Sequence, residues 1–161
     1  MNIKHLLLMI VLFGSSILNA QNSAFKSLFE KYENEDDVTV VSISKAMFNL
    51  IPGNIKTNNV DIKNIVPKIE SLLILTSEKD NVKSKMNADF RSLVEKDKNF
   101  EQLIRIKSGS SNITFHIKKK ENLIKELVML INDEKDFVVM HLSGNFTIED
   151  IQSIAKDSTT Q

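Results

Sequence analysis

Two strand-like segments joined by a glycine turn constrain the fold of this chain more than any other feature. Residues 100–107 and 112–118 flank Ser-Gly-Ser-Ser, and Gly109 followed by Ser110 suits a type II′ hairpin turn, which needs glycine in its first central position. One face of the resulting hairpin is mostly apolar and the other mostly polar, so turn chemistry and side-chain pattern agree. The predicted register pairs Ile106 with Ile113, Ile104 with Phe115, Gln102 with Ile117, Arg105 with Thr114, Leu103 with His116 and Glu101 with Lys118.

A second hairpin is predicted from residues 123–132 and 137–143, joined through 133–136, with Met129 opposite Met140. Both of its faces are largely apolar. Such a hairpin is central and covered on both sides, or it presents one face to a partner. We expect coverage, because the predicted helices suffice for it. One face carries Leu127, Met129, Ile131, Val138, Met140 and Leu142, and the other carries Ile124, Val128, Leu130, Phe137, Val139 and His141.

The remaining apolar patterns predict helices and further strands. Apolar residues spaced three and four apart indicate helices, and short β-branched runs indicate strands. The chain is therefore expected to adopt an α+β fold: a mixed sheet of about six strands, ending in an antiparallel meander, with helices packed on it. The expected helices cover 22–32, 45–51 (ended by Pro52 and Gly53), 62–69 with an interruption at Pro67, 80–95, and a last one opened by Thr147 and Asp150; the expected strands cover 38–43 and 72–75, and 57–59 is expected to be loop.

The first twenty residues have the pattern of a secretory signal peptide. Lys4 precedes the apolar run 6–13, and small or polar residues lead to a cleavage junction between Ala20 and Gln21. The apolar run is much shorter than the roughly 20 residues of a membrane-spanning helix. We therefore expect an exported protein, periplasmic or secreted, without a permanent membrane span after cleavage. An uncleaved anchor helix is the alternative. Residues 21–157 would form a single α+β domain and 158–161 a flexible tail.

Composition argues against several functional classes. The chain has 21 basic and 21 acidic side chains, so it has no net field to attract nucleic acid. It has no cysteine, which excludes disulfides, thiol catalysis and cysteine-ligated metal. The acidic run 33–37 lacks the alternating ligands and central glycine of a calcium loop. We expect no cofactor and no metal.

Two residue pairs are candidates for catalysis, although we expect no enzymatic activity. Ser42 and Lys45 match the S-x-x-K pattern of penicillin-interacting serine enzymes, but the companion motifs are missing and Ser42 should still lie in a strand. His141 lies diagonal to Glu126 across the second hairpin. Such a pair is either half of a general-base unit or a structural hydrogen bond or ion pair.

A group of basic residues is the candidate partner-binding site. We expect these side chains to gather near one end of the sheet, where they would contact an anionic envelope component. The alternative is a sheet edge kept soluble by lysine. The group consists of Arg105, Lys107, Lys118, Lys119 and Lys120.

The strand-to-helix segment 40–48 (VVSISKAMF), the strand 72–76 and the strand 126–130 (ELVML) carry a family resemblance. With the export signal, they make the chain resemble the domain of unknown function 4252 family. The resemblance implies a small exported protein or lipoprotein of Bacteroidota, linked to envelope stress or signalling. The missing cysteine departs from the lipoprotein members. The family implies no activity, so no functional residue is carried over.

These observations favour a non-catalytic binding or interaction module of the cell envelope, with an unknown envelope protein or an anionic envelope component as partner. Two alternatives stay open. One is a small envelope hydrolase using His141 with Glu126 or Ser42 with Lys45. The other is a structural subunit that self-associates through a strand edge.

Overall fold

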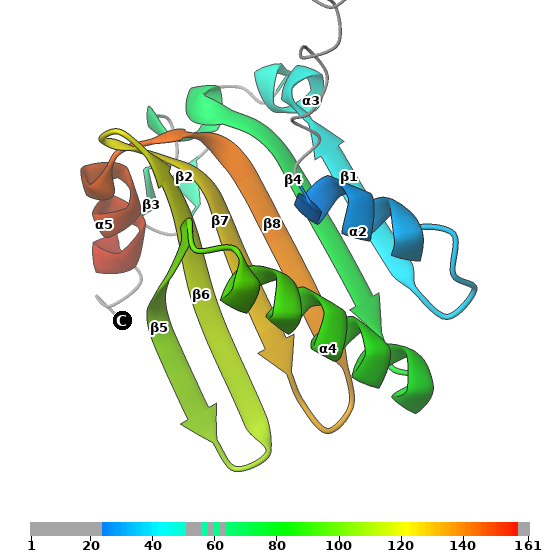
Figure 1. The fold of residues 1–161 in the computed structure, drawn as a ribbon. Helices are drawn as coiled ribbons and strands as arrows, with labels where there is room; N and C mark the ends of the chain where they lie inside the picture. The colour runs from blue at the N-terminus through cyan, green and yellow to red at the C-terminus, as the bar shows by residue number, and fades with distance from the viewer. Residues whose placement is uncertain (1–23, 51–55, 58–59, 62–63, 158–161) are drawn as a thin grey trace, which may run out of the picture.

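The computed structural model describes residues 24–50, 56–57, 60–61 and 64–157. Its centre is a six-stranded sheet in which every neighbouring pair is antiparallel (Figure 1). The α+β class and the closing meander are confirmed, although the sheet is antiparallel rather than mixed. The strands lie in the order β1 (Thr39–Ser44), β4 (Ile69–Ser77), β8 (Phe137–Phe146), β7 (Leu123–Asn132), β6 (Ser111–Lys120) and β5 (Phe100–Ser108).

Two helices, α2 (Ala24–Tyr32) and α4 (Asp80–Lys96), pack on one face of this sheet (Figure 1). Helix α2, which was expected over 22–32, buries Phe25, Phe29 and Tyr32. The Phe25 and Tyr32 rings lie against Phe90 of α4, with ring centroids 5.3 and 5.8 Å apart. The main core lies between these helices and the sheet. It consists of Phe25, Phe29, Tyr32, Leu75, Met86, Phe90, Val94, Val128, Leu130, Phe137 and Val139.

A second, smaller core lies on the opposite face, at one end of the sheet. Its strand residues alternate with those of the main core, as the pleat of a strand requires. The elements that surround this end are α3 (Lys45–Asn49), β2 (Lys56–Thr57), β3 (Val60–Asp61), η2 (Val66–Lys68) and α5 (Ile148–Asp157). The core consists of Phe48, Ile65, Ile69, Ile117, Ile124 and Phe146.

The predicted hairpin register holds near each turn and fails at bulges. Gly109 has φ of +58° and Ser110 is outside the left-handed region, as a type II′ turn requires. The three predicted pairs nearest this turn are confirmed, and so is Met129 opposite Met140. A bulge at Leu103 then shifts the first hairpin, so that Gln102 pairs with His116, Glu101 with Ile117 and Phe100 with Lys118. A bulge between Ile124 and Glu126 likewise moves Ile124 to the second core instead of the face predicted for it.

Several predicted boundaries change. Thr57 belongs to the two-residue strand β2 rather than to a loop, and the segment around Pro67 forms only the 3₁₀ turn η2 before β4 begins at Ile69. The start of α5 is confirmed: the Thr147 amide donates to Asp150 Oδ2 at 2.7 Å, and the Asp150 amide donates to Thr147 Oγ1 at 3.2 Å. Segment 1–20, the Ala20–Gln21 junction, Pro52, Gly53 and the tail 158–161 lie outside the described residues.

Candidate functional site

Two rows of side chains cross all six strands on the face opposite α2 and α4. Pairing partners in successive strands place their side chains next to one another on the same face, so the register fixes these rows. Ten of the twelve residues are apolar, two are threonines and none is charged. We call them the open rows: Val41, Ile74, Met140, Met129, Phe115 and Ile104 in the first, and Thr39, Thr76, Val138, Ile131, Ile113 and Ile106 in the second.

None of the twelve residues belongs to either core of the described part of the chain. At the two sheet edges Val41, Ile104 and Ile106 are 41, 50 and 48% exposed, and the seven other apolar residues are half-buried. We expected both sheet faces to be covered, and for these rows this is wrong within the described part of the chain. Helices α2 and α4 share one face, and the described elements on the other face reach only the next row, Ile43, Leu72, Leu142, Leu127 and Ile117.

The open rows form a patch large enough to bind a macromolecule. Strands lie about 4.8 Å apart and same-face residues about 6.8 Å apart along a strand, so the patch covers roughly 29 by 14 Å, or roughly 400 Å². Contiguous apolar patches of this size are often functional. None of the ten apolar residues lines the pockets described below. The patch is thus suited to a flat surface rather than to an enclosed small molecule.

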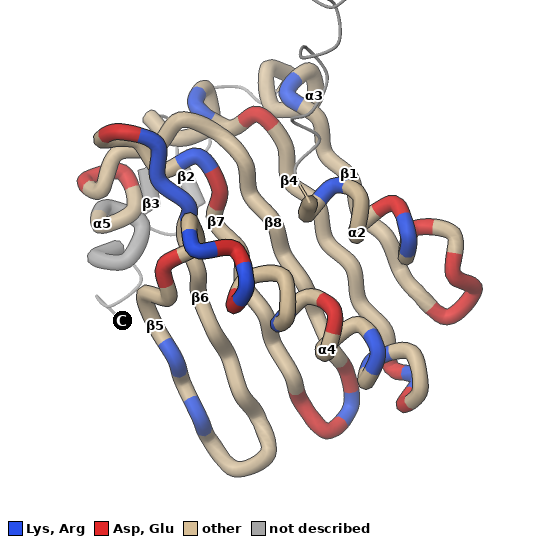
Figure 2. The backbone as a smooth tube through the Cα atoms, viewed as in Figure 1, with Lys and Arg blue, Asp and Glu red and all other residues tan. Residues whose placement is uncertain are grey.

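The basic residues predicted to gather at one end of the sheet do not gather there. Arg105 and Lys107 lie near the β5–β6 turn, whereas Lys118, Lys119 and Lys120 lie at the far end of the same hairpin (Figure 2). The antiparallel register of ten-residue β6 against β5 enforces this separation. Lys118 already forms ion pairs within the chain: its Nζ donates to Asp97 Oδ2 at 3.0 Å and lies 3.6 Å from Glu126 Oε1.

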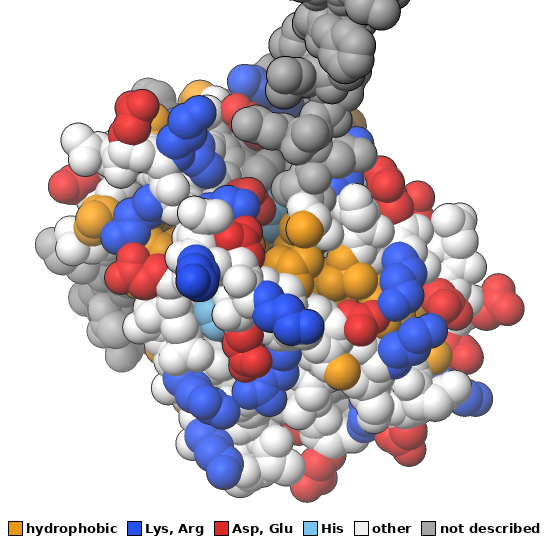
Figure 3. Space-filling model, in the orientation of Figure 1, with side chains coloured by type: hydrophobic (Ala, Val, Ile, Leu, Met, Phe, Trp, Pro, Cys, Tyr) orange, Lys and Arg blue, Asp and Glu red, His pale blue; other side chains and the backbone are white. Residues whose placement is uncertain are grey.

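On the helix-covered face, charged side chains are spread over the surface around a few apolar ones between the helices (Figure 3). Lys31 and Tyr32 of α2 both donate to Asp89 Oδ2 of α4, at 2.6 and 2.7 Å. Burial, followed by the hydrogen bond to Asp89, raises the pKa of Tyr32 well above its usual range. These contacts fix α2 on α4 and leave the helix-covered face polar on its outside.

The predicted His141–Glu126 pair forms. His141 Nε2 lies 2.9 Å from Glu126 Oε2. The residue is 5% exposed, and its ring is stacked on Phe25 with centroids 4.0 Å apart. Burial alone would raise the pKa of the Glu126 carboxyl, but the hydrogen bond from His141 and the charge of Lys118 hold that pKa below its ordinary value. The pair belongs to a half-buried series of polar contacts that continues through Lys118 to Asp97.

His141 and Glu126 line a pocket of about 460 Å³, together with Ser71 and Ser143. A general base would need its second nitrogen against a nucleophile. His141 Nδ1 is buried without a hydrogen-bond partner among the described residues, and Ser143 Oγ instead hydrogen-bonds Ser71 Oγ at 2.7 Å. The other catalytic candidate is divided between two elements, since Ser42 lies in β1, as predicted, and Lys45 begins α3.

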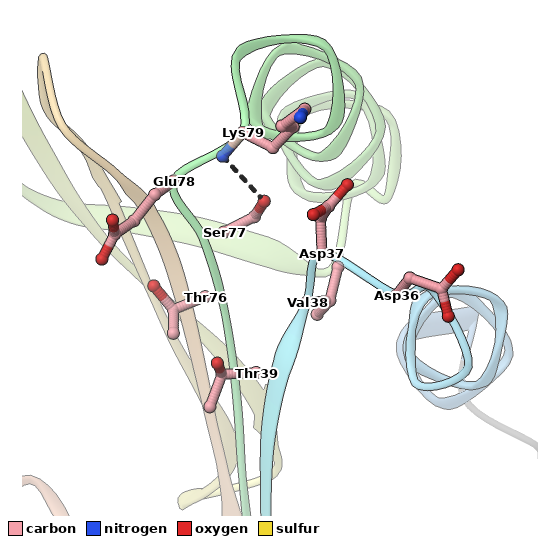
Figure 4. Close-up of a pocket in the computed structure, with 8 residues that line it drawn as sticks. All are labelled: Asp36, Asp37, Val38, Thr39, Thr76, Ser77, Glu78 and Lys79. Carbon is pink, nitrogen blue, oxygen red and sulfur yellow. Dashed lines mark hydrogen bonds between the residues drawn. The ribbon is translucent and has the colours of Figure 1, made fainter.

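A second pocket, of about 400 Å³, lies at the ends of β1 and β4 (Figure 4). It is lined by Asp36, Asp37 and Glu78, and their carboxylates point in different directions rather than toward one centre (Figure 4). In the portion of the chain that the structure describes, no group of three or more histidine, cysteine, aspartate or glutamate side chains is placed to hold a metal ion. Residues 33–37 of the acidic run are exposed at this corner of the sheet.

Comparison with known proteins identifies a family for this fold. Residues 32–154 match the family model described as a domain of unknown function, DUF4252. The chain belongs to this family. No curated protein and no solved structure matches it. All twelve positions of the open rows lie within the span that matches DUF4252, whereas most of α2 precedes it.

This DUF4252 chain has no helix, within the described ranges, that is long and apolar enough to cross a membrane. Sequence reasoning placed four residues of the open rows on one face of the central hairpin, Met129, Ile131, Val138 and Met140, but did not place Val41 and Ile74 beside them. A signal was available, because the segments 38–43 and 72–75 are apolar at successive positions and so on both faces.

Proposed function

We propose that this protein is an exported, non-catalytic binding module of the cell envelope, and that the open rows are its contact surface. The observation that carries this proposal is a patch of ten apolar residues across six strands that no described element covers. The pattern of residues 1–20 supports export. The resemblance that links the family to envelope stress or signalling supports a role in that context.

The chemistry of the patch favours a protein partner with a flat apolar surface. A fully buried interface core is depleted in charged residues and enriched in aromatic residues and methionine, and the open rows include Phe115, Met129 and Met140. An anionic envelope component is less favoured, because Lys118 is paired with Asp97 and Glu126 and Lys119 with Glu101. A catalytic role is not proposed, because His141 lacks a nucleophile on Nδ1.

Thiol labelling in cells tests both parts of the proposal. The natural chain has no cysteine, so M129C and M47C each supply a single thiol, the first in the open rows and the second on α3, where Met47 is 56% exposed. A maleimide that passes the outer but not the inner membrane should label M47C in intact cells, since the protein is exported. We expect M129C to react several-fold more slowly in cells than in dilute purified protein, since a partner covers it.

The two claims can fail separately. Absence of M47C labelling in intact cells, with normal labelling after lysis, would refute export. Equal reaction of M129C in cells and in dilute solution would refute the contact surface, because nothing would then cover the open rows.

A further inference from the structure

We infer that the occupant of the open rows is a second copy of this chain, packed sheet against sheet about a two-fold axis. This inference rests on the proposed function, because it names the partner of the same surface. Two sheets stacked face to face lie about 10 Å apart and bury the inner side chains of both. A two-fold pair presents the same patch from each copy, so the patch must be complementary to itself.

Side-chain size makes the open rows self-complementary. β8 and β7 are the two central strands of the sheet, so a two-fold axis parallel to the strands between them places β1 over β5 of the other copy and β4 over β6. The half of the patch on β1 and β4 is small, with Thr39, Val41 and Thr76, whereas the half on β6 and β5 is bulkier. The axis therefore sets small side chains against large ones. The facing pairs are Val41 with Ile104, Ile74 with Phe115, Met140 with Met129, Thr39 with Ile106, Thr76 with Ile113 and Val138 with Ile131.

Charge at the border of the patch does not oppose this axis. Asp37 and Glu78 follow the second row at the ends of β1 and β4. Placing β1 over β5 sets them over the turn end of β5 and β6 in the other copy, so the acidic borders of the two copies do not meet. Inside the patch there is no charge to repel a copy, and the whole chain has a formal net charge of zero.

The area suffices for a stable dimer. A standard interface buries roughly 800 Å² on each partner, with an apolar core inside a polar rim. The open rows supply roughly 400 Å² of core and already reach both sheet edges, and a margin of about 5 Å at each end along the strands brings the contact to roughly 700 Å² per copy, within the standard range. The exposed edge residues Ile104 and Ile106 extend the apolar part to the limit of the sheet.

This inference is tested by the mass of the protein in solution, measured as a function of concentration. The protein is the full chain, purified as the cell processes it. Sedimentation equilibrium should show a monomer–dimer equilibrium for the natural protein. Met140→Lys should give a monomer at every concentration, because it buries a charge at the centre of the contact. Met47→Lys is the matched control, since it makes the same change at a 56% exposed position on α3, and it should remain dimeric. Denaturant unfolding of both variants verifies that each is folded.

Mixed cysteine crosslinking tests the axis itself. Ile74 and Phe115 are separated by β8 and β7 within one chain, but they face each other across the proposed contact, where the two sheets lie about 10 Å apart. This spacing exceeds the roughly 7 Å between Cα atoms that a disulfide allows, so a short bismaleimide is the linker. It should give a covalently linked dimer from an equimolar mixture of I74C and F115C, and neither protein alone should form one. A linked dimer from either protein alone would contradict this axis.

A natural protein that is monomeric at all concentrations, while M129C stays protected in cells, would refute the second copy and leave the proposed contact surface intact. A monomer with M129C unprotected in cells would refute both.

Discussion

Replacing Phe90 by alanine is expected to lower the free energy of unfolding by about 3–5 kcal/mol. The Phe90 ring is completely buried at the point where α2, α4 and the sheet meet, in contact with the Phe25 and Tyr32 rings. Its removal leaves a cavity that three elements would have to close together. Since small domains have a total stability of about 5–15 kcal/mol, this loss is a large fraction of it, and the variant should unfold at a clearly lower urea concentration.

Urea unfolding followed by circular dichroism measures this change, and Phe115→Ala is the matched control. Phe115 is half-buried in the open rows, so its truncation removes fewer contacts and opens no enclosed cavity. Its cost should be well under half that of Phe90→Ala. Equal costs at the two positions would mean that the open rows are packed as tightly as the main core, which would contradict the described fold.

Replacing Gly144 by alanine is expected to cost at least about 2 kcal/mol of stability. Gly144 is buried in β8, and an added Cβ would lie 2.3 Å from the backbone oxygen of Lys68 and 2.5 Å from the ring of Phe146. A backbone atom cannot turn away as a side chain can. The start of β4 would have to shift, together with the Lys68–Asp150 ion pair, at 2.7 Å, that holds α5.

Gly109→Ala separates steric contact from backbone strain in the same experiment. An added Cβ at Gly109 meets nothing within 4 Å, so the cost there comes only from its φ of +58° and should be about 1 kcal/mol. We expect Gly144→Ala to be clearly the less stable of the two by urea unfolding. A smaller loss for Gly144→Ala would show that the β4–β8 junction is not closely packed.

The sequence alone was sufficient to predict most of the fold, because its local signals agree with one another. Gly109 in the first central position of its turn predicted the register of β5 and β6 near that turn, and the four-residue loop 133–136 predicted that of the central hairpin. The bulges at Leu103 and before Glu126 were not predictable. A bulge adds one residue without a distinct composition, and each moved the residues beyond it to the other face of the sheet.

The candidate site was predictable only in part, since it depends on which strands become neighbours. Met129 and Met140 were placed on one apolar face, but the extension of that face through Ile74 to Val41 follows from β4 pairing with both β8 and β1. No local signal shows which face of a sheet a helix will cover. Helices α2 and α4 both cover the face that contributes to the main core, where Phe90 is buried. The expected gathering of Lys107 with Lys118 failed for a related reason, because antiparallel pairing puts them at opposite ends of a hairpin.

Methionine oxidation of the natural chain by hydroxyl radicals tests the central claim most directly, because the chain contains one exposed and one buried methionine with which the others can be compared. Met47 is 56% exposed, Met86 is completely buried, and Met129 and Met140 lie at the centre of the open rows. In dilute purified protein, Met129 and Met140 should be oxidised at rates between those of Met47 and Met86, and in concentrated or native complexes their rates should fall to that of Met86. Oxidation of Met129 and Met140 as slow as that of Met86 already in dilute monomer would show that the chain covers this face itself, and would contradict the account.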